Sequence, residues 1–425
     1  MYQLSLTIIL AVCLSALSAT SQDVPHDWKD DVERLSSRAF MGRGYLFGGA
    51  DSAANLIRDR FRMVGLDSLD RGYFHTFPLR VNEFPVSPSF SINGVAMELG
   101  RDFLPHATSG TGVIGADVPV TVVIDSMQKL LEIEGDLGVV VMNGTVDSAL
   151  LAQGLLPPEF RTIDGWLGLV ALRRAVAVVL VTDRLIGEET THRAKFPIVV
   201  ALRERLPLKL TKVELSVRSE RFTASPKNVI GFVRGTEAPD SFVVITAHYD
   251  HLGSIGPDFH FPGANDNASG TAMVLDLASR FATRPARYTV VFVAVAGEEA
   301  GLVGSQALVR DRVISIRRTR FLLNIDMAAS GAQGITAVGG NEFAEEFRLL
   351  QTIAQGIGIG DVRPREQAPI SDHHPFVVAG ARAFYVYPFT GLQPYHHVND
   401  VPQTLEPEVY LRLRHLFETF IRELR

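Results

Sequence analysis

The carboxyl-terminal part of this chain alternates continuous apolar runs with longer amphipathic stretches, and this pattern constrains the fold most strongly. The runs VVITA and VVFVAVA lack the polar alternation of a half-exposed strand, which indicates strands buried on both faces of a sheet. Helical stretches between such strands are typical of α/β proteins. We therefore predict an α/β fold with a mostly parallel mixed sheet flanked by helices. The predicted strands span 228–234, 242–247, 288–296, 321–325, 334–338 and 383–387, and the predicted helices span 269–282, 342–356 and 406–423.

Three segments precede this α/β unit, which we place at residues 226–425. Residues 1–21 hold a short apolar run followed by small polar residues, as in a secretory signal peptide. Residues 22–78 carry apolar residues at three- and four-residue steps, which predicts helices that pack on the α/β unit. Residues 79–225 contain short β-like runs separated by Gly, Pro and Asn, which predicts an inserted, mainly β second domain. Its predicted strands span 118–124, 138–142, 176–182, 197–201 and 210–217.

Composition excludes several kinds of chemistry and partner. The only cysteine, Cys13, lies in the apolar leader, so the remaining chain has no Cys-based zinc site or thiol nucleophile. The formal net charge of −6 argues against nucleic acid as a partner. The longest later apolar stretch, Trp166 to Val181, is interrupted by two arginines, so we expect no membrane span in the mature chain. We expect a protein that is secreted or held in the periplasm or cell envelope, with a lipid anchor at Cys13 as the less favoured alternative.

Ionisable residues follow the predicted strands at the points where those strands end. Open α/β sheets place their ligand sites beyond the carboxyl ends of the strands, so these residues are expected to meet at one edge. Interiors rarely bury so many ionisable groups unless the groups pair or bind a metal. The residues are His248 and Asp250, Asp266, Glu298 and Glu299, Asp326, and His396 in a later connection.

Each of these residues also has an ordinary structural alternative. Asp266 could cap the helix that follows it, and adjacent glutamates are common in solvated loops. Taken together, two histidines and three carboxylates without a thiolate suit zinc, with manganese or cobalt as substitutes. One carboxylate can bridge two ions. Glu298 and Glu299 cannot point the same way from an extended backbone, so one can bind metal while the other acts as a general base. Asp250 is placed to accept a hydrogen bond from the imidazole of His248.

The candidate residues all lie within a set of six sequence blocks. They are AHYDHLG (247–253), PGANDNASGTA (262–272), GEEAGLVGS (297–305), NIDM (324–327), SDHHPF (371–376) and YHHVND (395–400). In order and spacing they resemble the signature blocks of the double-zinc aminopeptidases, peptidase family M twenty-eight. The resemblance covers most of residues 228–425 and extends more loosely to LSSRAFMGRG near the N-terminus. The insertion is similar to a protease-associated domain, with VAVVLVT and KFPIVV in the expected places.

The resemblance implies a zinc exopeptidase fold, two zinc ions per chain and peptide substrates. It assigns one ion to His248 and Asp326 and the other to Glu299 and His396, with Asp266 bridging the two. It makes Glu298 the general base of an aminopeptidase. Two further histidines, His373 and His374, correspond to residues that line the pocket or support it from behind without binding metal.

Other functions remain open at this point. A glutaminyl cyclase of the same superfamily uses one zinc ion, and a receptor-like relative would keep the fold as a binding scaffold without activity. The complete ligand set and the insertion favour the peptidase. Carboxypeptidase or dipeptidase action is harder to separate, because it depends on whether the pocket holds a free amine or a free carboxylate.

Overall fold

The computed structural model describes residues 27–69, 72–124, 129–133, 135–145, 162–389 and 394–425. The predicted signal peptide at residues 1–21, with Cys13, lies outside these residues. None of the described helices combines the length and apolar character needed to cross a membrane.

The centre of the α/β unit is an eight-stranded mixed sheet, which confirms the predicted fold class. Its middle strands β17, β14, β18 and β21 run parallel to one another, whereas β13 pairs with β17 and β19 pairs with β21 in antiparallel fashion. All six predicted strands of this unit are present. In spatial order the strands are β1 (Phe74–Thr76), β13 (Lys227–Val233), β17 (Tyr288–Val295), β14 (Ala238–His248), β18 (Thr319–Ile325), β21 (Ala383–Pro388), β19 (Gly334–Val338) and β20 (Asp361–Arg365).

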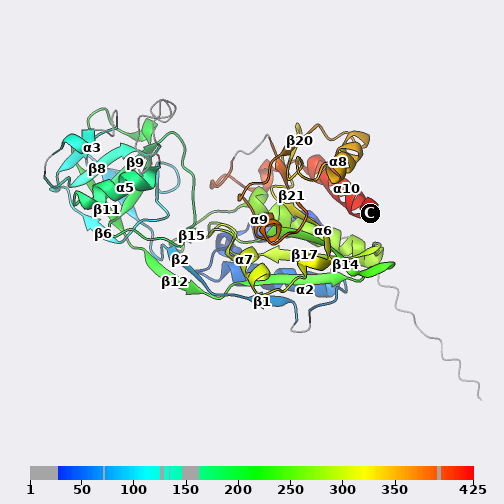
Figure 1. Cartoon of the computed structure of the whole chain (residues 1–425). Helices are drawn as coiled ribbons and strands as arrows, with labels where there is room; N and C mark the ends of the chain where they lie inside the picture. The colour runs from blue at the N-terminus through cyan, green and yellow to red at the C-terminus, as the bar shows by residue number, and fades with distance from the viewer. Residues whose placement is uncertain (1–26, 70–71, 125–128, 134, 146–161, 390–393) are drawn as a thin grey trace, which may run out of the picture.

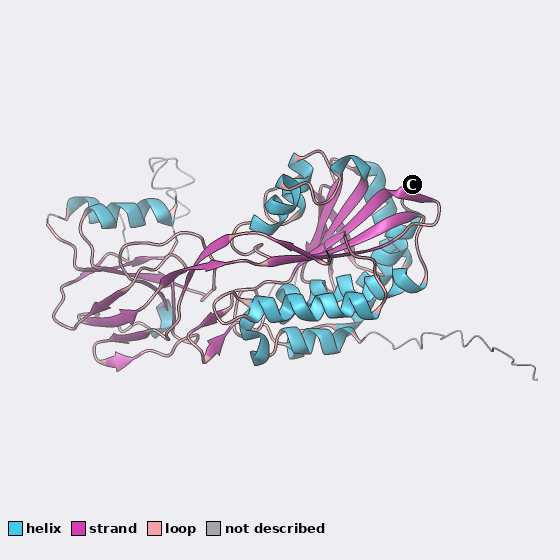
Figure 2. Ribbon diagram, turned by 90° about the horizontal axis from the view of Figure 1, so that it is seen from below, coloured by secondary structure: helices cyan, strands magenta, loops and turns pink. Residues whose placement is uncertain are grey.

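Helices cover both faces of this sheet, as Figure 2 shows. Successive residues of β14 point to opposite faces, so Val243 and Ile245 join one apolar core while Val244 joins the other. The first and larger core is closed by α1 (Trp28–Leu35), α2 (Gly49–Met63), α6 (Gly270–Thr283), α8 (Ala344–Gly356) and α10 (Pro407–Glu423). The second is closed by α7 (Val303–Arg310) and α9 (His373–Val378). Strand burial on both faces explains why these strands are continuous in apolar residues.

An aromatic cluster packs α10 against the sheet. The ring of Phe384 on β21 is fully buried, 4.8 Å from the ring of Phe321 and 6.0 Å from that of Phe420 between centroids. We expect Phe384→Ala to lower the free energy of unfolding by about 3–5 kcal/mol, because the change removes apolar contacts and leaves a cavity. Urea denaturation at fixed zinc concentration measures this loss. Leu208→Ala, at a fully exposed leucine, is the control and should change stability by less than about 0.5 kcal/mol.

The insertion forms a separate body joined to the α/β unit by a two-stranded ribbon, β2 (Leu79–Glu83) with β12 (Glu220–Ala224) (Figure 1). One of its sheets has the strand order β5-β10-β9-β8-β7, in which β7 to β10 are parallel, and α5 (Ile163–Leu172) packs on it. The strands are β5 (Phe103–Pro105), β7 (Val120–Val122), β8 (Val139–Asn143), β9 (Ala177–Thr182) and β10 (Ile198–Leu202). The second sheet holds β3 (Ser89–Ile92), β4 (Val95–Ala96), β6 (Gly112–Ile114) and β11 (Val213–Val217). The five strands predicted for the insertion correspond to β7, β8, β9, β10 and β11.

Candidate metal centre

The predicted metal ligands meet in one cavity of about 320 Å³ at the carboxyl edge of the sheet. His248 ends β14, Glu299 follows β17, and Asp326 follows β18. Asp266 lies in the short helical segment η4 (Ala264–Ser269) that leads into α6. His396 arrives from the connection before α10. The parallel middle strands therefore bring together residues that are far apart in the sequence.

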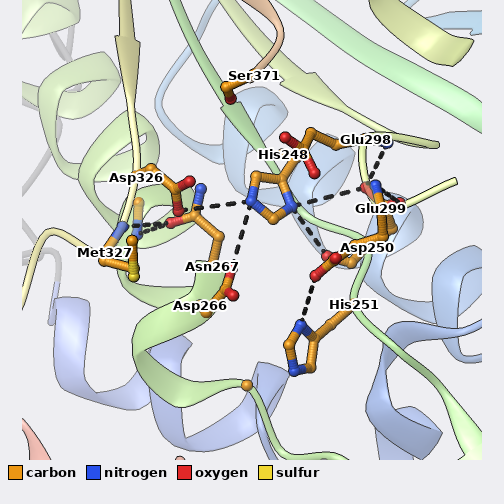
Figure 3. A network of polar contacts seen from close by, with 12 residues as sticks. His248, Asp250, His251, Asp266, Asn267, Glu298, Glu299, Asp326, Met327 and Ser371 are labelled. Atoms are coloured by element: carbon orange, nitrogen blue, oxygen red, sulfur yellow. Dashed lines mark hydrogen bonds and ion pairs between the residues drawn. The ribbon is translucent and has the colours of Figure 1, made fainter. Parts of the chain in front are cut away.

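One group of potential ligands surrounds His248. Its Nε2 atom lies 3.4 Å from Oδ1 of Asp266 and 3.5 Å from Oδ1 of Asp326. Ligand atoms of these three buried residues all lie within 4.8 Å of one another. Figure 3 shows His248 between the side chains of Asp326 and Asp250. Ligand atoms this close together can all bind one metal ion.

A second group surrounds His396. Its Nε2 atom lies 3.1 Å from Oδ2 of Asp266 and 3.2 Å from Oε2 of Glu299. His251, which the sequence analysis did not single out, joins this group through its Nδ1 atom, 2.8 Å from Oε1 of Glu299. The two oxygens of Asp266 thus face the two groups separately, which is the geometry required of a bridging carboxylate.

The chemistry of these residues fits zinc. Oδ2 of Asp266 and Oδ1 of Asp326 are buried and face the ring nitrogens of His396 and His248, at 3.1 Å and 3.5 Å, with no other hydrogen-bond partner among the described residues. A buried carboxylate that is not fully compensated is costly. Burial alone would raise the pKa of Asp266, but contacts with His248 and His396 outweigh it and hold that pKa well below its usual range. A site that keeps its carboxylates ionised and supplies only imidazole nitrogen and carboxylate oxygen suits a borderline divalent cation.

Backbone carbonyls orient both histidines. Nδ1 of His248 lies 3.1 Å from the carbonyl oxygen of Asp250, and Nδ1 of His396 lies 3.0 Å from that of Gly187. A carbonyl accepts only, so each Nδ1 carries a proton and each Nε2 points into the cavity, where it donates to Asp266 when protonated and would offer its lone pair to a metal ion when neutral. Gly187 belongs to the insertion and also donates its N–H to the carbonyl of His396 at 2.9 Å. The insertion therefore contacts a predicted metal ligand, His396, through the backbone of Gly187.

Asp250 has a different contact from the one predicted. Its carboxylate oxygen lies 3.8 Å from Nδ1 of His248, beyond hydrogen-bond distance, because the backbone carbonyl of the same residue takes that proton. The carboxylate instead accepts from the hydroxyl of Tyr45 at 3.0 Å. It also faces the N–H groups of Glu298 and Glu299, each at 3.4 Å. Asp250 thus positions the two glutamates rather than the imidazole.

Glu298 lines the cavity but belongs to neither ligand group. Burial raises the pKa of Glu298 well above its usual range; the charge of His248 opposes this shift, and that of Asp372 adds to it. A carboxyl group that lies close to the potential metal ligands, but is not one of them, is available for proton transfer. The side chains of Glu298 and Glu299 thus differ in position, although both residues lie in a turn after β17 and not in the extended backbone that the prediction assumed.

Two residues outside the ligand groups hold the Asp266 segment in place. The buried guanidinium of Arg43 donates to the carbonyl of Gly263 at 2.8 Å and to that of Asp266 at 3.2 Å, besides three other carbonyls. The carboxylate of Asp400 accepts the N–H groups of Asn265 and Asp266, both at 2.9 Å. Neither role was predicted, although Arg43 lies in the LSSRAFMGRG block and Asp400 in the YHHVND block.

The two other predicted pocket histidines, His373 and His374, are not among the described residues that line the cavity. His373 stacks on the ring of Tyr385 with centroids 5.3 Å apart. The hydroxyl of Tyr385 donates to Oδ2 of Asp326 at 2.9 Å. His373 therefore supports the metal centre from behind the wall of the cavity.

Two carboxylates lie near the junction of the ribbon and the insertion: Glu83, which is buried, and Glu189, which is half-buried. Burial raises the pKa of Glu83 to about 8, although the backbone N–H groups of Tyr45 and Leu46 lower it. Burial, and next the charge of Glu83, raise the pKa of Glu189. Such a group keeps its proton in the folded state while the unfolded state loses it. The free energy of unfolding therefore falls as pH rises from about 4.5 to about 8.

We expect Glu83→Gln to flatten this decline, because the amide stays neutral and keeps an acceptor for the two N–H groups. At pH 8 the variant should exceed the wild type in unfolding free energy by on the order of 1 kcal/mol or more, and the two should converge near pH 4. Urea denaturation of the zinc-free protein across this range measures the difference. Glu188→Gln, at the exposed residue next to Glu189, should leave the decline in unfolding free energy unchanged. If Glu83→Gln declined as steeply as the wild type, the decline could not come from Glu83.

Comparison with known proteins identifies the family. Residues 228–421 match Peptidase family M28. A probable zinc metalloprotease of Leptosphaeria maculans is 40% identical over 26% of this chain and 26% of its own length, and Aminopeptidase YwaD of Bacillus subtilis is 29% identical over 48% and 44%. The chain spans about a quarter to a third of the length of the fungal relatives that it matches. A zinc aminopeptidase from Bacillus subtilis has the same fold, with 20% identity, a TM-score of 0.69 and coverage of 95% of this chain and 96% of its own. Residues 228–421 therefore form a domain of peptidase family M28.

Proposed function

We propose that this protein is a two-zinc aminopeptidase, which removes residues from the N-terminus of peptides. The observation that carries this proposal is the position of Asp266, whose two oxygens face two separate ligand groups in one cavity beside Glu298. The similarity to a zinc aminopeptidase of known structure and to Aminopeptidase YwaD supports the choice of reaction.

The residues present would hold two ions. His248, Asp266 and Asp326 would bind the first, and Asp266, Glu299 and His396 would bind the second, with His251 fixing the carboxylate of Glu299. When bound, the zinc ions supply Lewis acidity, which polarises a carbonyl group and makes a neighbouring water more acidic. Glu298 accepts a proton from the attacking water and returns it to the departing amine. Asp250 holds Glu298 through its backbone N–H.

The size of the cavity favours action at the end of a peptide. About 320 Å³ is near the lower limit for small-molecule sites, so a few residues fill it. The insertion contributes Arg184 and Ile186 to its lining and so forms part of its wall. Four carboxylates line the inner end and attract a free ammonium group as well as metal ions.

A substrate panel tests this function. The zinc-loaded protein should hydrolyse leucine 4-nitroanilide and leucyl-leucinamide, and acetylation of the substrate amine should abolish both reactions. A chelator should remove the activity and zinc should restore it, with two ions bound per chain. Binding of one ion per chain, together with cyclisation of N-terminal glutamine and no hydrolysis, would replace the proposal with a glutaminyl cyclase.

The proposal includes export of the protein. Residues 1–21 would act as a signal peptide, and the mature chain would then contain no cysteine. N-terminal sequencing of the protein recovered from its native source tests this. A mature chain that begins at Met1 would contradict it.

A further inference from the structure

Arg365 lines the catalytic cavity, and the proposed chemistry makes no use of it. It ends β20 at the edge of the sheet, and Tyr387 on β21 also lines the cavity. The guanidinium donates a hydrogen bond to the hydroxyl of Tyr387 at 2.9 Å. We propose that Arg365, positioned by Tyr387, is a subsite for a carboxylate group of the peptide substrate. This inference rests on the proposed peptidase function.

A stacked pair of tyrosines links this arginine to the metal centre. The rings of Tyr387 and Tyr385 stack with centroids 5.0 Å apart, and the hydroxyl of Tyr385 donates to Asp326 at 2.9 Å. Arg365 is thus connected to the predicted zinc ligand Asp326 through Tyr387 and Tyr385. A substrate whose scissile carbonyl lies at the metal centre can therefore extend its next group along the tyrosines towards the guanidinium.

The charges near Arg365 leave it available for a ligand. Arg363 on the same strand and Arg382 just before β21 pair with carboxylates of the protein at 2.8 Å and 2.6 Å. Within the part of the chain that the structure describes, the ion pairs include none from Arg365. A guanidinium has several donors in a fixed plane, matches a carboxylate in bidentate geometry and cannot lose its charge. The cavity is lined by four carboxylates and by a second arginine, Arg184. A cation at the position of Arg365 favours a substrate that carries a negative charge opposite its amine.

The carboxylate has two sources in a peptide, an acidic side chain or the free C-terminus of a short peptide. Three matched pairs of substrates separate them. Glutamyl and glutaminyl 4-nitroanilide differ only in the first side chain, and leucyl-glutamate amide and leucyl-glutamine amide differ only in the second. Dileucine and leucyl-leucinamide differ only at the C-terminus. The zinc-loaded wild type should prefer the carboxylate member of at least one pair by about tenfold to a hundredfold in kcat/KM.

Variants assign that preference to its residue. Arg365→Gln should remove the preference and leave kcat/KM for the uncharged member within about twofold, because only the charge-assisted contact is lost. Arg365→Lys should keep part of the preference, since it keeps charge without the planar fork. Tyr387→Phe should reduce it through loss of the positioning hydrogen bond. Arg348→Gln, at an exposed arginine of α8 outside the described lining, makes the same charge change and should have no effect.

The outcomes distinguish this inference from the proposed function. A wild type that cleaves leucyl-leucinamide but favours no carboxylate would overturn the subsite and leave the peptidase intact. So would a preference that disappears in Arg184→Gln and persists in Arg365→Gln, since Arg184 also lines the cavity. Absence of hydrolysis of all six substrates with two zinc ions bound would instead overturn the proposed function.

Discussion

Replacing Glu298 by glutamine is expected to reduce turnover by about 10²–10⁴-fold while both zinc ions stay bound. Glu298 lines the cavity but is in neither ligand group, so the change does not remove a metal ligand. Glutamine has the same shape and keeps the hydrogen bond from the backbone N–H of Glu298 to Asp250. It cannot take a proton from water at any relevant pH. The loss should therefore appear in kcat, with little change in KM.

The adjacent residue offers a matched control for this experiment. Glu299→Gln changes a neighbouring side chain in the same way, but Glu299 lies 3.2 Å from His396 and 2.8 Å from His251 within the second ligand group. It should lower the zinc content at one site. Elemental analysis and kcat for leucine 4-nitroanilide should be measured on both variants at equal free zinc. A fully active Glu298→Gln enzyme, or one that loses zinc while Glu299→Gln retains it, would contradict the assigned roles.

The sheet, and the edge of it that carries the predicted metal ligands, could be predicted because strands buried on both faces appear in the sequence as continuous apolar runs. A strand such as β14 contributes Val243 and Ile245 to one core and Val244 to the other, so none of these positions tolerates a polar residue. Polar residues at the end of such a strand then stand out. This is how His248 could be placed at the metal centre from its position alone.

The supporting contacts could not be predicted, since they join distant segments. Arg43 binds the carbonyl of Tyr249, which is 206 positions away, and His396 binds that of Gly187, 209 positions away. A backbone carbonyl has no sequence signature, so nothing marks it as a partner. The same limit explains Asp250, whose carbonyl makes the contact with His248 that was predicted for its carboxylate, while the carboxylate accepts from Tyr45.

Short and atypical elements were also missed. The six-residue helix α9 is too short for a clear period, and α7 has only eight residues. Strand β20 contains Pro364, which disfavours a strand prediction and is tolerated here because β20 lies at the edge of the sheet. That edge strand ends in Arg365, so the missed element carries the arginine of the proposed subsite.

Replacing Asp266 by asparagine is expected to weaken both zinc sites together and to lower kcat/KM by about 10²–10³-fold or more. Its Oδ1 atom faces His248 at 3.4 Å, and its Oδ2 atom faces His396 at 3.1 Å. Asparagine supplies one oxygen and turns an amide nitrogen towards the other group, and that nitrogen has no lone pair to offer the cation. Loss of one negative charge from between two cations acts on both. Loss of a ligand used by one ion alone should affect only that ion.

Asp276 provides the control for this change, because it is a buried aspartate on α6 outside the described lining of the cavity. Arg280 and Arg414 hold its carboxylate at 3.1 Å and 3.2 Å. Asp276→Asn should lower the melting temperature and leave both zinc ions bound, whereas Asp266→Asn should fold and titrate with weakened affinity at both sites. Isothermal titration with zinc, with circular dichroism to check folding, separates the two variants. If Asp266→Asn binds one ion with wild-type affinity, Asp266 is a ligand of a single ion, and the two groups act as independent sites.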